Sequence, residues 1–453
     1  MKYRTEKDAL GEIKVPSDAL YGAQTQRAVE NFKISGLKMQ KPFIVFLALI
    51  KKNAAVVNGD LGLVDGIISD AVAKAAQEII EGKHDDQFVV DVFQTGSGTS
   101  TNMNMNEVIA RRAVQIITGM HKDEINVHPN DHVNLCQSSN DVIPSALNIS
   151  VSYLIEHELL PALNKIKESL EARSNAFSDI HKLGRTHLQD AVVMTLGDEF
   201  SGYASQIKEG IDRLNGVRKY LLQLSLGGTA VGTGINAHPE FASRVIKRIA
   251  EETGIQFTET MNHFASQAAQ DNSVAVSGAL KTIAVSLTKI ANDIRWLSSG
   301  PRAGLGEINL PALQPGSSIM PGKVNPVIPE AILQVAAQVI GNDATVTAAA
   351  MSGNFELNTM LPVIAYNLIQ SIEILSSASV LFSEKCIKGI TVNKERCALN
   401  VENSLDTAVK LIPYVGYDSA SEIAKKAYEE GKTIKQVVIE NKILSQEQIS
   451  EIW

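Results

Sequence analysis

The sequence has few cysteines, no excess of positive charge and no long uninterrupted apolar run. Its three cysteines, Cys136, Cys386 and Cys397, lack the spacing of metal ligands and are odd in number. We therefore expect free thiols in a reducing compartment. The formal net charge of −8 argues against general nucleic-acid binding. It leaves room for a locally positive pocket that binds a small anion.

The longest uninterrupted apolar run extends from Phe43 to Ile50, which is far shorter than the ~20 residues that cross a bilayer. The first ten residues are rich in charge and contain no apolar block, so they do not resemble a secretory signal. These features predict a soluble, cytoplasmic protein. Its 453 residues, 44% hydrophobic and 20% charged, are enough for several domains or one long architecture.

Helical periodicity dominates the middle of the chain. Apolar residues recur at steps of three and four over 280–297, and similar stripes cover 159–170, 196–214 and 364–375. The pattern predicts a mainly α protein with four or five long helices in a bundle. Strand signals are sparse, and we expect strands only near the N-terminus, as at Gly11 to Val15. Because the helices are apolar on more than one side, we also expect a homo-oligomer.

Composition and periodicity divide the chain into three expected domains. Residues 1–137 mix shorter helices with polar loops, and one of these helices ends near Gly82. Residues 138–389 form the long-helix domain. Residues 390–453 form a small helical domain, in which Gly431 stops one helix and Ser445 with Gln448 caps another.

Residues 316–326 read Gly-Ser-Ser-Ile-Met-Pro-Gly-Lys-Val-Asn-Pro and form the segment most indicative of chemistry. The glycines and prolines exclude a regular helix. Two hydroxyls, a cation and an amide within one loop can surround a small anion. An ordinary connection between helices is the simpler interpretation, and only companion segments elsewhere argue against it.

Three companion segments carry hydroxyls, amides or histidines in glycine-rich or turn-forming contexts. Residues 94–107 can form a backbone nest beside Ser97 and Thr99, but they lack the ending of a P-loop. Residues 128–140 contain His-Pro-Asn-Asp-His followed by Ser-Ser-Asn, and the intervening proline favours a turn over a metal site between the histidines. Residues 186–190 place a histidine beside a hydroxyl. Another glycine-rich stretch, 227–234, lacks the glycine order and β-α-β context of a dinucleotide site, so we expect a loop.

Together these segments resemble the aspartase/fumarase superfamily, whose signature Gly-Ser-Ser-x-Met-Pro-x-Lys-x-Asn-Pro stands at 316–326. The resemblance covers essentially the whole chain, from Glu6-Lys7-Asp8 to Gly416-Tyr417-Asp418. Within the superfamily the chain is most similar to the class II fumarases (fumarate hydratases), whose sequence motifs it matches at 94–99, 137–141 and 353–358.

Two other functions, one enzymatic and one structural, remain open at this point. Residues 308–311 and 327–330, together with Cys136, are more similar to aspartate ammonia-lyases. Aspartases, however, tend to show Gly-Ala-Gly at 96–98 and Ser-Thr-Asn at 138–140, and these segments face substrate, so fumarase is preferred. A scaffold that has lost catalysis, as in some lens crystallins, is disfavoured because every matched catalytic position is intact.

The resemblance implies a homotetramer with five long helices per subunit, a twenty-helix core and active sites assembled from three chains. It implies reversible hydration of fumarate to L-malate by anti addition or elimination through an aci-carboxylate, with no metal or organic cofactor. Ser317 would be the base, Lys323 and Asn325 would hold the carboxylate, and His187 oriented by Glu330 would assist departure of the hydroxyl. The residues expected to bind the dicarboxylate are Ser97, Gly98, Thr99, Ser138, Ser139, Asn140, Thr186, Ser318, Lys323, Val324 and Asn325.

The resemblance also implies a second anion site at His128, Pro129, Asn130 and Asp131. Fumarases often have an arginine three residues before this histidine, whereas this chain has Ile125. We expect the second site to be weaker or differently shaped.

Overall fold

The computed structural model describes residues 2–120 and 125–453. The chain forms two compact units, each assembled from three stretches of sequence. The first comprises Met1–Pro161, Gly210–Ala284 and Val335–Ser376, and the second comprises Ala162–Glu209, Val285–Gln334 and Ser377–Trp453. The expected three-domain division stays a prediction.

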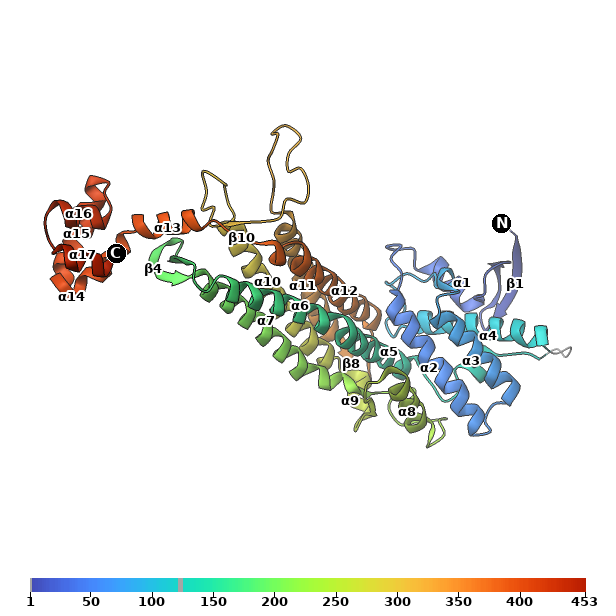
Figure 1. The fold of residues 1–453 in the computed structure, drawn as a ribbon. Helices are drawn as coiled ribbons and strands as arrows, with labels where there is room; N and C mark the ends of the chain where they lie inside the picture. Colours follow the sequence, from blue (N-terminus) through green and yellow to red (C-terminus); the bar gives the residue numbers. More distant parts are fainter. Residues whose placement is uncertain (1, 121–124) are drawn as a thin grey trace. The chain divides into compact units, whose positions relative to one another are not determined.

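The predicted long helices are confirmed (Figure 1). In the described residues they form five long helical segments. Every residue of the stripe over 280–297 is at most 3% exposed, so the apolar periodicity identified a buried face. The segments are α5 (Ser139–Leu154), which continues through a π-helical turn (Ile155–Leu159) into α6 (Leu160–Ala176), and α7 (Leu196–Arg218), α10 (Asp271–Leu297), α11 (Val327–Ala350) and α12 (Leu361–Lys385).

Buried polar bonds hold neighbouring long helices together within each unit. In the first unit, Ser277 of α10 donates to Asp343 of α11 at 2.8 Å, and Asn342 of α11 donates to Ser371 of α12 at 3.0 Å. In the second unit, the Tyr203 hydroxyl of α7 donates to Asp293 of α10 at 3.0 Å. Such bonds fix the register of the helices, whose apolar faces supply the hydrophobic stabilisation.

The rest of the first unit is a set of shorter helices and three pairs of short strands, β1 with β2, β5 with β6 and β8 with β9. Helices α2 and α3 pack side by side, and α3 packs on α4 (Figure 1). Gly82, with φ of 80°, follows the end of α3 as predicted. The elements are β1 (Tyr3–Asp8), β2 (Gly11–Pro16), α1 (Ala23–Asn31), α2 (Lys41–Asp60), α3 (Gly66–Ile80), α4 (Thr99–Met120), β5 (Gln223–Leu224), α8 (Phe241–Thr253), β6 (Thr258–Glu259), α9 (His263–Ala268), β8 (Gly353–Asn354) and β9 (Leu357–Asn358).

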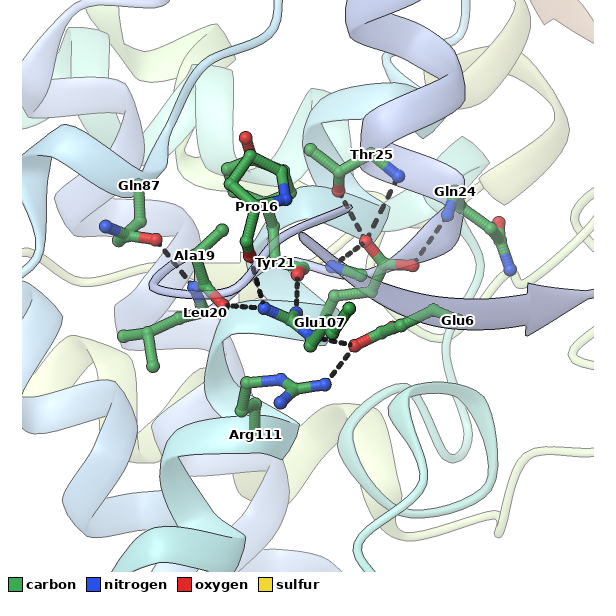
Figure 2. Close-up of polar contacts among 12 residues, drawn as sticks. Glu6, Pro16, Ala19, Leu20, Tyr21, Gln24, Thr25, Gln87, Glu107 and Arg111 are labelled. Carbon is green, nitrogen blue, oxygen red and sulfur yellow. Dashed lines mark hydrogen bonds and ion pairs between the residues drawn. The ribbon is translucent and has the colours of Figure 1, made fainter. Parts of the chain in front are cut away.

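The carboxylate of Glu107, on α4, fixes the start of α1 (Figure 2). It accepts hydrogen bonds from the backbone amides of Gly22, Gln24 and Thr25 at 2.9–3.1 Å and from the Thr25 hydroxyl at 2.6 Å. A carboxylate at this end satisfies free N–H groups and matches the positive end of the helix dipole. The last residue of the polar segment 94–107 is therefore structural.

The second unit ends in a small helical cluster with its own buried core, formed by residues such as Leu411, Ile434 and Val437. Gly431 ends α15 in the left-handed conformation, and Ser445 with Gln448 forms the capping box at α17, both as predicted. The elements are β3 (His181–Thr186), β4 (Gln189–Thr195), β7 (Ile308–Asn309), β10 (Thr391–Val392), α13 (Lys394–Asn403), α14 (Ile412–Val415), α15 (Tyr417–Glu430), α16 (Ile434–Glu440) and α17 (Gln446–Ile452).

The expectation that strands occur only near the N-terminus is wrong. The predicted strand at Gly11 is present in β2, but β3 and β4 form an antiparallel hairpin from His181 to Thr195. The strands pair only with each other, and polar residues such as Gln189 and Asp190 interrupt the apolar alternation, so periodicity gave little signal for them.

Within residues 2–120 and 125–453, three helices are long and apolar enough to cross a membrane by length and composition alone: α2, α10 and the segment Leu361–Gly389 that includes α12. The expectation of no spanning segment rested on uninterrupted runs, whereas an average over eighteen residues tolerates polar positions. Each helix has one most apolar stretch of eighteen residues. The share of that stretch that is buried inside the protein is 72% in α2, 50% in α10 and 56% in Leu361–Gly389.

Candidate functional site

The signature loop lies in the second unit, just before α11, and its own backbone closes it. The amide of Gly316 donates to the carbonyl of Lys323 at 2.8 Å, and Asn325 Nδ2 donates to the carbonyl of Gly316 at 2.8 Å. A Cβ at Gly316 would lie 2.7 Å from the Lys323 carbonyl oxygen. Glycine is therefore required for this close approach.

Ser317, the second residue of this loop, is half-buried, and two backbone amides donate to its hydroxyl. Oγ accepts hydrogen bonds from the amides of Ile319 at 3.2 Å and Met320 at 3.0 Å. Two fixed donors favour an oxyanion over a neutral hydroxyl. Ser318, the next residue, is exposed.

Two hollows meet at Lys323, whose side chain has no hydrogen-bond or ion-pair partner in the described residues. One, of about 670 Å³, is lined by Lys323, Val324, Asn325 and Glu330, with Arg295 among the other polar groups. The other, of about 480 Å³, is lined by Ser317, Lys323 and Val324. A free ammonium beside an amide is suited to binding a carboxylate.

His187 occupies the tip of the β3–β4 hairpin, where Thr186 pairs with Gln189. His187 and Leu188 form the two-residue turn, with φ of 55° and 59°. Positive φ at both positions is typical of tight hairpin turns, but residues other than glycine and asparagine adopt it at a cost. Thr186 and His187 are exposed, and the imidazole has no partner in the part of the chain that the structure describes.

The hairpin rests on a buried ion cluster in the second unit that sequence reasoning missed. Glu307 is fully buried and pairs with Arg185 and Lys182, which is 1% exposed. Burial raises the pKa of Glu307, but the hydrogen bond from Arg185 and the charge of Lys182 outweigh burial and hold the pKa below its usual value. Asn400 of α13 donates to the same carboxylate at 3.0 Å.

In the first unit, the N-termini of α4 and α5 lie together. Ser97 lies just before α4 and Thr99 is its first residue, and their hydroxyl oxygens are 2.9 Å apart. Asn102 Nδ2, one turn into α4, donates to Ser139 Oγ at 3.0 Å. Ser138 caps α5, and Asn140 Nδ2 donates to the carbonyl of Ala230 at 2.8 Å. Two helix N-termini with hydroxyl donors form an environment that favours a carboxylate.

Gly98, at the start of α4, has φ of 74° and packs tightly on Ile143 of α5. The preceding glycine is equally constrained, because a Cβ at Gly96 would overlap the carbonyl oxygen of Thr359. The amide of Leu361 also donates to the Gly96 carbonyl at 3.0 Å. Thr359 and Leu361 therefore hold the loop that carries the hydroxyls.

Beneath Ser138–Asn140 lies a buried network whose lysine and aspartate were assigned no role from the sequence. Lys51, fully buried on α2, donates to Asn134 Oδ1 at 2.8 Å and Gln137 Oε1 at 3.0 Å. Burial lowers the pKa of Lys51 to about 7, against an opposing contribution from the charge of Asp141. A signal was present, since Lys51 shares a helix face with buried Leu47.

Asp141 ties the glycine-rich stretch 227–234 to the start of α5. Its carboxylate accepts from the amides of Gly227 at 3.1 Å and Thr229 at 2.9 Å, and burial raises its pKa to about 6. The stretch is a loop, as predicted.

The expected second anion site is a π-helical turn from Pro129 to Val133, consistent with the predicted turn. His128 Nδ1 accepts from the amides of Asn130 at 3.3 Å and Asp131 at 3.1 Å. His128, Asn130 and Asp131 are exposed, and Ile125 is half-buried. No group of three possible metal ligands occurs among the described residues.

The predicted site residues therefore gather into separate groups. Ser317, Lys323, Asn325 and Glu330 share one loop and the helix start after it, whereas His187 lines neither hollow beside Lys323. Ser97–Thr99 and Ser138–Asn140 come together in the first unit.

Comparisons with known proteins identify the family. A family model described as lyase matches residues 11–341, and one described as fumarase C C-terminus matches residues 408–453. A fumarate hydratase class II from Nitrosomonas europaea is 51% identical, covering 100% of this chain and 98% of that protein. One from Halobacterium salinarum is 52% identical, covering 99% and 96%.

Solved structures agree with these relatives. A recombinant class II fumarase from Schistosoma mansoni has a TM-score of 0.95 and 39% identity, covering 100% of this chain and 98% of that chain. A fumarate lyase:delta crystallin from Brucella melitensis, bound to cobalt, has a TM-score of 0.93 and 45% identity, with the same coverage. This chain belongs to the lyase family and, within it, to the class II fumarate hydratases.

Proposed function

We propose that this protein catalyses the reversible hydration of fumarate to L-malate. Its relatives at about half identity are named fumarate hydratases. The observation that carries the proposal is the pair of backbone amides directed at Ser317 Oγ. The alternative, aspartate ammonia-lyase, is not favoured, because the relatives at about half identity are named fumarate hydratases.

Removing a proton from the carbon beside a carboxylate is the difficult step, because the resulting aci-carboxylate carries two negative charges. Ser317 takes this proton. The amides of Ile319 and Met320, 3.2 and 3.0 Å from Oγ, make the serine oxyanion accessible by stabilising its charge.

Lys323 and Asn325 hold the carboxylate on which charge develops. The Lys323 ammonium is exposed and unpaired, so no existing bond must break when the substrate binds. Asn325 uses one amide hydrogen to close the loop onto Gly316, which leaves its second hydrogen for the substrate. Each such donor is worth about 3 kcal/mol of barrier.

His187 protonates the departing hydroxyl, which leaves as water when the C–O bond breaks, and Glu330 orients the imidazole. His187 is exposed at the hairpin tip, and its imidazole makes no hydrogen bond to the described residues of its own chain. Ser97, Gly98, Thr99, Ser138, Ser139, Asn140, Thr186, Ser318 and Val324 surround the dicarboxylate. His128–Asp131 forms a second anion site. The proposal requires no metal or organic cofactor.

A homotetramer assembles this site, with groups from three chains in each active centre and twenty long helices in the core. Two features support it: Lys323 and His187 are exposed in the single chain, and about half of the apolar windows of α10 and Leu361–Gly389 is not buried. The apolar surface of these helices is then covered by other subunits, which also supports a cytoplasmic location.

Absorbance of the fumarate double bond tests the proposal. Purified protein is given L-malate, then L-aspartate. We expect fumarate to form from malate alone. Fumarate from aspartate alone would establish the ammonia-lyase, and no fumarate from either would leave only a non-catalytic scaffold. Mass measurement in solution should give about four times 48.9 kDa.

A further inference from the structure

A buried chain of hydrogen bonds runs from Lys51 to Ser139 in the first unit. Lys51 Nζ donates to Asn134 Oδ1 at 2.8 Å. The same oxygen accepts from Asn102 Nδ2 at 3.2 Å, and Asn102 Nδ2 also donates to Ser139 Oγ at 3.0 Å. Lys51 and Asn102 are 0% and 1% exposed, so water does not compete for these bonds.

The lysine determines the direction of every bond in this chain. An ammonium only donates, so Asn134 must turn its oxygen toward Lys51 and its nitrogen toward the carbonyl of Gln137, 3.2 Å away. Because Asn134 offers an oxygen, Asn102 must offer its nitrogen. An uncharged amine still has two hydrogens for its two acceptors, Asn134 and Gln137, and the bond from Asn134 to the Gln137 carbonyl holds the amide in the same orientation.

The direction of the chain fixes the role of the Ser139 hydroxyl. Ser139 Oγ accepts from Asn102, and its own hydrogen has no acceptor among the described residues. Ser139 is the first residue of α5 and is 9% exposed. The hydroxyl is therefore left as a donor at a helix N-terminus, where an anion is favoured.

We propose, resting on the fumarate hydratase function proposed above, that Lys51 and Asn102 are positioning residues that commit Ser139 to donate its hydrogen to a substrate carboxylate. Neither residue touches the substrate. Without Asn102, the Ser139 oxygen loses its donor and the hydroxyl is no longer held in one orientation, so binding of the dicarboxylate weakens while the proton transfers are unchanged.

The test compares two buried asparagines of α4. Asn102→Ala should raise the KM for L-malate about tenfold or more, with kcat changed less than about threefold. Asn106 is the matched control, because it is also fully buried and donates to Asn134 Oδ1, at 3.3 Å, but has no bond to Ser139. Asn106→Ala should lower the Tm to a similar extent and leave KM within about twofold.

A double-mutant cycle separates positioning from general damage. Ser139→Ala alone should raise KM, and adding Asn102→Ala should raise it by less than about twofold more. Lys51→Met, which keeps length and removes the donors, should likewise act on KM only when Ser139 is present. If Lys51→Met does not fold, the comparison of Asn102 with Asn106 still decides.

Three results would overturn this inference: an unchanged KM in Asn102→Ala, an equal rise in Asn106→Ala, or effects of Asn102→Ala and Ser139→Ala that multiply independently. A wild-type protein that does not convert malate would instead overturn the proposed function, so the two failures are distinguishable.

Discussion

Arg185, two residues before His187, forms a double ion pair with Glu307. Its Nη2 lies 2.5 Å from Glu307 Oε1 and its Nη1 lies 3.1 Å from Oε2. Glu307 also faces the buried ammonium of Lys182 at 3.5 Å. The hairpin that carries His187 is thus tied to the segment before the signature loop by a buried ion cluster.

Glu307→Gln should destabilise the protein by about 3–5 kcal/mol, because Arg185 loses its buried counter-charge and Lys182 keeps only Glu199, at 2.9 Å. Activity should fall as well, since His187 loses its support. Denaturant unfolding with kcat/KM measures both. Glu395→Gln, on the exposed side of α13, is the control and should stay within about 0.5 kcal/mol of wild type. Equal stability of the two variants would contradict a supporting role.

Ser317→Ala should lower kcat by about 10²–10⁴ with a small change in KM, because the proton acceptor is lost while the carboxylate donors remain. Steady-state kinetics with malate measures the split. Ser318→Ala, at the exposed neighbouring hydroxyl, should act mainly on KM. A Ser317→Ala enzyme with near-normal turnover would remove Ser317 as the base.

His187→Asn should lower kcat by about 10² or more, since the group that protonates the leaving hydroxyl is lost. Asparagine tolerates the positive φ of 55° at this position, so the turn is expected to stay intact. His181→Asn, at the exposed start of the same hairpin, serves as the control and should leave kcat unchanged. If His181→Asn lowers kcat as much, the effect belongs to the hairpin and not to the imidazole.

Glu78 should make stability sensitive to acid. The hydrogen bond from Arg112 lowers its pKa to about 2, with a smaller contribution from His84. The unfolded carboxyl therefore binds protons at higher pH than the folded one. The stabilisation is present above about pH 4.5 and is lost as pH falls toward 2, by up to about 3 kcal/mol. Unfolding of wild type and Glu78→Gln between pH 3 and 6 measures the difference, which the exposed Glu12→Gln should not reproduce.

Gly96→Ala should cost about 1–3 kcal/mol and reduce activity, because the new Cβ would overlap the Thr359 carbonyl and displace Ser97–Thr99. Gly216→Ala is the matched glycine change, since a Cβ there meets nothing within 4 Å on helix α7. It should stabilise the protein by about 0.5–1 kcal/mol. Thermal unfolding with malate kinetics measures both, and a Gly96→Ala variant as stable and active as wild type would contradict the packing argument.

The sequence was informative wherever a local rule governs structure. The stripe over 280–297, the stop at Gly431 and the cap at Ser445 were all predicted correctly, because helix periodicity and capping involve residues only a few positions apart. The signature at 316–326 indicated the family for a similar reason, since its chemistry is carried by contiguous residues.

The sequence by itself therefore determined the long helices, the helix ends at Gly82, Gly431 and Ser445, and the family. Only the tertiary structure decided that Lys51 is buried against Asn134, that Glu307 faces Arg185 and that His187 sits on a hairpin. The first two features depend on contacts between residues 83 and 122 positions apart, whereas the hairpin is a local structure whose apolar alternation is too weak to predict it. The burial that gives a lone lysine or glutamate its importance comes from the packing of distant segments, and the chain alone does not name the partners of that residue.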